Sequence, residues 1–308
     1  MDILIQAPDF AEDNWWPQQQ LAARVPAFLA HHSQAGSDFQ IGVLHQCIFP
    51  DCQGGLSRSP ADPDRILRPT TIGLEEQLVL RLAGDYPPPR GFYPQYYLYA
   101  WLTLTPPLLT GPNAGFARPD TRFVFVWISP FMDTYVIEPR ESPPEASPHA
   151  EIGQLAKFMS TVSGGTPKLS SVFLTTLRNV VDAPPYYCRS NPTPFAHIAV
   201  PPRIFSAATA DSYTGEVCPA DESEFDEIVE RMAEVTSGLH THFALPTQPD
   251  FGAGPIEVVI DGAPTPALNA QGEIVWEYQS GANAVHFPVA KTPRPGQKVL
   301  LRYHAQAP

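Results

Sequence analysis

The segment Phe123–Ile128 constrains the fold more than any other part of the sequence. It reads Phe-Val-Phe-Val-Trp-Ile, so apolar side chains occupy successive positions and face both sides of the strand that they predict. A strand that is apolar on both faces is typical of a sheet covered by helices on each side. We therefore expect this strand at the centre of an α/β sheet.

Strands and helices alternate around this segment. Apolar runs predict strands at residues 2–7 and 39–44, a short strand or helix start at 171–174, and strands at 197–200 and 240–245. Helical spacing of apolar residues predicts helices at 17–32, 73–82, 93–104, 152–159 and 222–237. Pro26 should interrupt the first of these helices. This order predicts a doubly wound, mostly parallel sheet over residues 1–248, with helices on both faces.

The pattern changes in the last part of the chain. Short strands are expected at 256–260, 274–278, 284–287 and 298–303, separated by turns that contain Gly, Pro and Asn. Asp261-Gly262 is a typical hairpin turn. These features predict a small all-β unit over residues 249–308, packed on the larger domain because so short a segment buries little core by itself.

Composition and charge exclude two classes of function. The chain has 19 Lys and Arg against 32 Asp and Glu, for a net charge of -13, and it has no basic cluster that would neutralise a phosphate backbone, so we expect no nucleic-acid partner. No apolar run is long enough to span a bilayer, so we expect no transmembrane segment. Met1 stands directly before the first expected strand, and we expect a native leader to have been replaced by this start residue.

Four cysteines indicate the compartment. Cys47 and Cys52 lie in the short segment Cys-Ile-Phe-Pro-Asp-Cys, which suits a small disulfide-closed loop, and Cys188 with Cys218 is the second candidate pair. The spacing typical of zinc sites is missing from both segments. We therefore expect disulfides and an extracytoplasmic location: periplasmic, outer-membrane-associated or secreted. The alternative is four buried thiols in a reducing compartment.

Several motifs, taken in order, resemble a known family. They are the opening Asp-Ile-Leu, Asp-Phe-Gln-Ile-Gly-Val at 38–43, Gly-Leu-Glu-Glu-Gln at 73–77, the stretch at 114–129 and Thr-Gly-Glu-Val-Cys at 214–218. The tail adds Ile-Glu-Val-Val-Ile-Asp-Gly at 256–262, Trp-Glu-Tyr at 276–278, Asn-Ala-Val-His-Phe at 283–287 and 295–303. Together they resemble secreted von Willebrand factor A (vWA) proteins of the myxobacterial type, which close with a β unit. The resemblance covers nearly the whole chain and implies a vWA-like α/β domain.

The resemblance also implies a place for a metal-ion-dependent adhesion site. In this family an Asp-x-Ser-x-Ser loop, a Thr and a second Asp hold Mg²⁺, and one coordination position remains for a carboxylate of the partner. The matching positions here are Asp9, Ala11 and Asp13 in the first loop, Thr70 or Thr71 in the second, and Pro130 followed by Asp133 in the third.

Two of these positions depart from the family pattern. Ala11 has no ligand oxygen, and Pro130 offers neither a ligand nor an amide. The resemblance therefore implies a lost or weakened metal site and no cofactor, with Mg²⁺ held by Asp9, Asp13 and Thr71 as the alternative.

Few other residues suggest chemistry. The usual nucleophile, zinc-protease and nucleotide-binding motifs do not occur, so we expect no enzymatic activity. His240 and His242 would share one face of a strand and permit a metal pair, but exposed polar histidines without a third ligand are the simpler interpretation. Trp15 and Trp16 would lie in the metal-site loop, where exposed aromatics form interface hot spots.

These observations predict a non-enzymatic interaction or adhesion module at a cell surface, as a secreted protein or lipoprotein. A protein or surface partner would bind the loop edge through Asp9, Asp13, Trp15, Trp16, Thr71 and Asp133. The alternatives are a structural subunit of a cell-surface assembly that contacts copies of itself, and, less favoured, a carbohydrate-binding protein that uses its aromatic residues.

Overall fold

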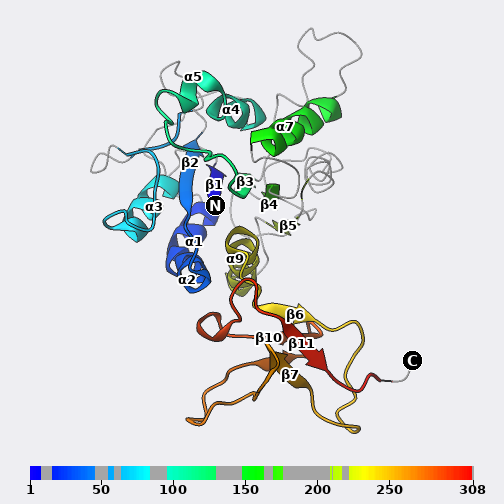
Figure 1. Cartoon of the computed structure of the whole chain (residues 1–308). Coiled ribbons are helices and arrows are strands. Elements are labelled where there is room, and N and C mark those ends of the chain that lie inside the picture. Colours follow the sequence, from blue (N-terminus) through cyan, green and yellow to red (C-terminus); the bar gives the residue numbers. More distant parts are fainter. Residues whose placement is uncertain are drawn as a thin grey trace. The chain divides into compact units, whose positions relative to one another are not determined.

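A five-stranded parallel sheet organises the larger part of the chain in the computed structural model (Figure 1). The structure describes residues 1–7, 16–45, 55–58, 64–83, 96–129, 148–162, 169–175, 209, 211–216 and 222–306. The chain divides into two units: Met1–Phe28 with Asp38–Thr236, and Leu29–Ser37 with Ser237–Pro308.

The sheet of the first unit has the order β2-β1-β3-β4-β5, and every pairing is parallel. Its strands are β1 (Asp2–Ala7), β2 (Gln40–His45), β3 (Phe123–Ser129), β4 (Leu169–Thr175) and β5 (Asp211–Glu216). This is one of the two common orders of doubly wound sheets. The predicted α/β class and parallel sheet are confirmed.

Strand β3 lies at the centre of this sheet, between β1 and β4. Each residue of its Phe123–Ile128 segment is at most 2% exposed. The rings of Phe125 and Trp127 meet Phe173 of β4 edge-on, with centroids 6.2 and 5.5 Å apart. The prediction of a central strand buried on both faces is confirmed.

Helices flank the sheet. They are α1 (Trp16–Ala23), α2 (Val25–Ala35), α3 (Leu74–Ala83), α4 (Tyr96–Thr103), α5 (Pro106–Leu109), α7 (Pro148–Val162) and α9 (Glu222–Ser237). Figure 1 shows α4 and α7 on one side of the sheet and α1, α3 and α9 on the other. The helix predicted at 17–32 is interrupted as expected, since α2 starts beside Pro26, where a missing amide costs no helical hydrogen bond.

Strand β5 is not among the predicted strands. Its sequence, Asp-Ser-Tyr-Thr-Gly-Glu, has too few apolar residues to give the periodic signal. Burial, with a contribution from the Glu227 charge, raises the pKa of the Tyr213 phenol to about 12. The strand predicted at 197–200 lies outside the described residues.

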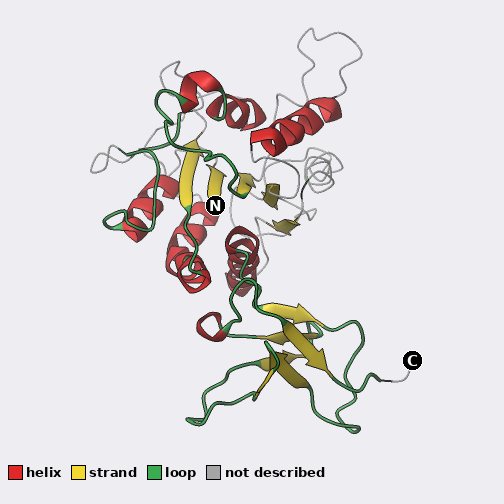
Figure 2. Cartoon of the chain, in the orientation of Figure 1, coloured by secondary structure: helices red, strands yellow, loops and turns green. Residues whose placement is uncertain are grey.

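The second unit contains two three-stranded sheets, with the orders β6-β10-β9 and β11-β7-β8. Residues 238–306 of this unit form strands, loops and one short 3-10 helix, η3 (Val289–Lys291) (Figure 2). The strands are β6 (His242–Ala244), β7 (Glu257–Ile260), β8 (Ala263–Thr265), β9 (Glu277–Gln279), β10 (Ala284–His286) and β11 (Val299–Arg302). Their core gathers around Trp276, Val285 and Phe287.

One strand belongs to a different sheet than expected. The sequence predicts that the strand at 240–245 belongs to the large parallel sheet, but β6 pairs antiparallel with β10. The run of alternating strands and helices before it gives no sign of this change of partner. Residues 237–248 accordingly belong to the second unit, whereas the predicted boundary lies at residue 248.

The Asp261-Gly262 turn joins β7 to β8 and offers a pH test. Both residues have positive φ, 50° and 85°, as a two-residue hairpin turn requires. The Lys298 amide and the Gln297 side chain donate hydrogen bonds to the Asp261 carboxylate, at 2.8 and 2.9 Å. These two bonds lower its pKa from 3.8.

The lowered pKa gives this carboxylate a defined contribution to stability. Because the folded pKa lies below the unfolded one, the contribution is present above pH 3.8 and disappears as the pH falls through the folded value. We expect Asp261→Asn to be less stable than the wild type at neutral pH, and the difference to shrink in acid. A carboxyl carbon NMR titration should give a pKa below 3.8, and a value at or above it would contradict the assignment.

Candidate functional site

The order in which the chain adds strands to the parallel sheet reverses between β1 and β3. From β1 the chain goes to β2 on one side, and from β3 it continues to β4 and β5 on the other. Strands β1 and β3 are direct neighbours, with Gln6 opposite Trp127, so both finish at the same edge. In doubly wound sheets, ligands bind at the carboxyl ends of the strands, beside the point where the strand order reverses.

Most of the predicted site residues follow these two strand ends in the sequence. Asp9, Asp13 and Trp15 come after β1, which ends at Ala7, and Asp133 comes after β3, which ends at Ser129. These four residues lie outside the described residues. Trp16 begins α1, and its side chain also lies outside the described part.

Thr71 is the one predicted site residue whose side chain the structure describes, and it lies elsewhere. Leu67 forms an antiparallel bridge with Ile41, the second residue of β2. The chain therefore runs from Leu67 toward the edge at which β1 and β2 begin. The Thr71 hydroxyl accepts a hydrogen bond from the Arg68 amide at 2.9 Å. The structure does not bring Thr71 to the carboxyl edge. The joint site with Asp9 stays a prediction, because Asp9 lies outside the described residues.

The opposite, amino edge of the sheet carries a buried charge cluster. The Asp2 carboxylate is fully buried, and it accepts hydrogen bonds from the Arg118 side chain at 2.9 Å and the Thr121 hydroxyl at 3.0 Å. Arg118 also contacts the exposed Asp38 at 2.7 Å. Burial alone would lower the pKa of Arg118, but its bonds to Asp38 and Asp2 outweigh this and raise the pKa. The cluster fixes the start of β1 and has a structural role.

The predicted disulfides cannot be placed. Cys47, Cys52, Cys188 and Cys218 all lie outside the described residues. Among the described helices, none has the length and apolar character needed to cross a membrane.

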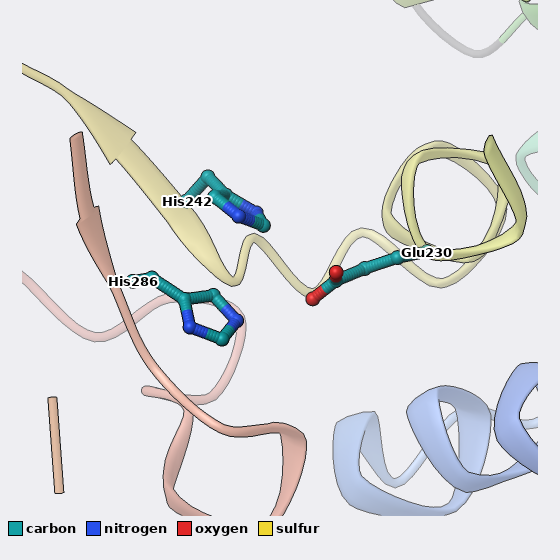
Figure 3. Close-up of side chains that lie close together, drawn as sticks. All are labelled: Glu230, His242 and His286. Carbon is teal, nitrogen blue, oxygen red and sulfur yellow. The ribbon is translucent and has the colours of Figure 1, made fainter. Parts of the chain in front are cut away.

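The histidine pair considered from the sequence is replaced by another. His240 precedes β6 and is exposed, while His242 is the first residue of that strand. In the register of the sheet, His242 lies opposite His286 of β10, and His286 lies opposite Glu277 of β9. Figure 3 shows the two imidazole rings side by side on neighbouring strands. Glu230, also drawn there, belongs to α9 of the first unit, whereas His242, His286 and Glu277 belong to the second unit.

No protein-family model matches the chain, and no protein of curated function is similar to it. The sheet edge and the residues described above are therefore the features of this chain that bear on its function.

Proposed function

We propose that this chain is a non-enzymatic, extracytoplasmic interaction module of the vWA type, which binds a protein or cell-surface partner at the carboxyl edge of its parallel sheet. The observation that carries the proposal is the change of direction between β1 and β3, the position at which doubly wound sheets bind their ligands. Segments 8–15 and 130–147 begin at that edge, and they contain Asp9, Asp13, Trp15 and Asp133.

Metal-independent binding suits this edge better than a cation bridge. An adhesion metal site needs several hard oxygen ligands held together. Ala11 and Pro130 supply none, and Thr71 belongs to a segment at the other edge of the sheet. Asp9 and Asp13 alone make an incomplete site. We then expect the partner to bind Trp15 and Trp16, because Trp side chains buried at an interface supply much of the binding free energy.

A selection of peptides from a random display library tests this proposal. We expect peptides that bind the wild-type chain to lose about 2 kcal/mol or more of binding free energy against the Trp15→Ala/Trp16→Ala double variant. Phe251→Ala is the matched control, because Phe251 is an aromatic residue of the second unit with 57% of its surface exposed. Unfolding curves of both variants should show that the fold persists. Peptides that bind both variants as well as the wild type would contradict the proposal.

A further inference from the structure

The row His242, His286 and Glu277 lies on one face of the β6-β10-β9 sheet. In each strand the polar residue is next to an apolar one, and the three apolar neighbours Phe243, Val285 and Tyr278 are opposite one another in the same register. These apolar residues belong to the core of the second unit. Since successive side chains of a strand point to opposite faces, the polar row lies on the face away from that core.

The two imidazoles are close enough to share one ion. Their ring centroids are 4.5 Å apart, and a nitrogen of one ring lies within 4.8 Å of a nitrogen of the other. Zinc bonds imidazole nitrogen at about 2.0 Å in a tetrahedral arrangement, which needs the two nitrogens roughly 3.3 Å apart. Binding therefore requires the two rings to turn until their nitrogens reach this separation. Cross-strand neighbours on a sheet are held in register by the backbone, so the pair is preorganised.

The surroundings of the rings match those of metal-binding histidines. The Thr241 hydroxyl and Nδ1 of His242 share a hydrogen bond of 3.0 Å. The Glu277 carboxylate faces Nδ1 of His286 at 3.5 Å, an ion-pair distance rather than a hydrogen bond. In metal sites a carboxylate or other oxygen on one ring nitrogen orients the imidazole so that the second nitrogen binds the ion.

We propose that His242 and His286 bind a divalent ion of the late first transition row, with Zn²⁺ as the best fit, through their Nε2 atoms, and that Glu277 positions His286. Imidazole suits Zn²⁺, Cu²⁺ and Ni²⁺, whereas Mg²⁺ and Ca²⁺ require oxygen ligands. Two histidines provide half of a tetrahedral shell, so water completes it and the ion exchanges readily. This site is independent of the proposed partner edge in the first unit.

Calorimetric titration of Zn²⁺ into the full, chelator-stripped chain tests the site. We expect one binding event that weakens by more than about 100-fold in His242→Gln and in His286→Gln, since loss of a ligand exceeds the usual cost of losing an outer-shell partner. Glu277→Gln should weaken it about 10-fold. His240→Gln is the matched control and should bind as the wild type does, because His240 lies outside the strand. Mg²⁺ should give no comparable heat.

Several outcomes would overturn this inference. They are no Zn²⁺ binding by the wild type, equal binding by the His242→Gln or His286→Gln variant, or an equal loss in the His240→Gln control. A second measurement needs no variant and so remains informative if a substitution disturbs folding. Paramagnetic Co²⁺ added to the wild type should broaden the backbone NMR signals of β6 and β10 first. Broadening that starts elsewhere would place the ion at another site.

Discussion

Replacing Arg118 by alanine is expected to lower the free energy of unfolding of the first unit by about 3 kcal/mol, because removal of one partner leaves a buried charge uncompensated. Asp2 has no exposed surface, and Arg118 is its partner in a 2.9 Å ion pair. We expect a loss of stability at the lower end of the range that is usual for a broken buried ion pair. The reason is that the Arg118 side chain is 26% exposed and that Thr121 still donates a hydrogen bond to Asp2.

Lys157→Ala is the control for this change. It removes the same charge from an exposed position on α7 and should alter the unfolding free energy by less than about 0.5 kcal/mol. The measurement is urea unfolding followed by circular dichroism at the helical band, which reports mainly on the first unit. Equal, small effects of both variants would show that the charge cluster does not stabilise the start of β1.

Trp127→Ala should have an effect of similar or greater size, about 3 to 5 kcal/mol, because it removes the largest side chain of the core and leaves a cavity. Trp127 is fully buried in the central strand, and its ring contacts Phe173 edge-on. The neighbouring strands are fixed by backbone hydrogen bonds and cannot collapse into the space.

Ile72→Ala serves as the comparison for this variant, since Ile72 is 95% exposed in the same unit. We expect its unfolding free energy to stay within about 0.5 kcal/mol of the wild type. Urea unfolding again gives the two values. A loss below about 1 kcal/mol for Trp127→Ala would mean that the sheet centre is loosely packed, contrary to the structure.

Local patterns in the sequence predict the first unit well where burial is complete. The run Phe123–Ile128 predicts a strand covered on both faces, and the structure confirms it. Pro26 breaks the first helix for an equally local reason. Local patterns do not predict the polar strand β5, because hydrogen bonds to β4, and not an apolar pattern, make it a strand.

The candidate sites depend on register, which no local pattern contains. His242 and His286 are distant in the sequence and meet only because β6 pairs with β10. The sequence spacing suggests His240 as the partner of His242 in a metal pair. His240 is not part of the proposed pair, because β6 begins after it. Thr71 likewise follows a segment that pairs antiparallel with β2, and this pairing directs it away from the carboxyl edge.

We propose that the carboxyl edge between β1 and β3 binds a partner without a metal ion. A selected peptide tests this proposal through its dissociation constant, measured for the wild type, the Trp15→Ala/Trp16→Ala variant and the Phe251→Ala control, each in EDTA and in excess Mg²⁺. We predict that affinity falls only in the tryptophan variant and that EDTA changes nothing. Loss of binding in EDTA, or a loss confined to Phe251→Ala, would contradict the account.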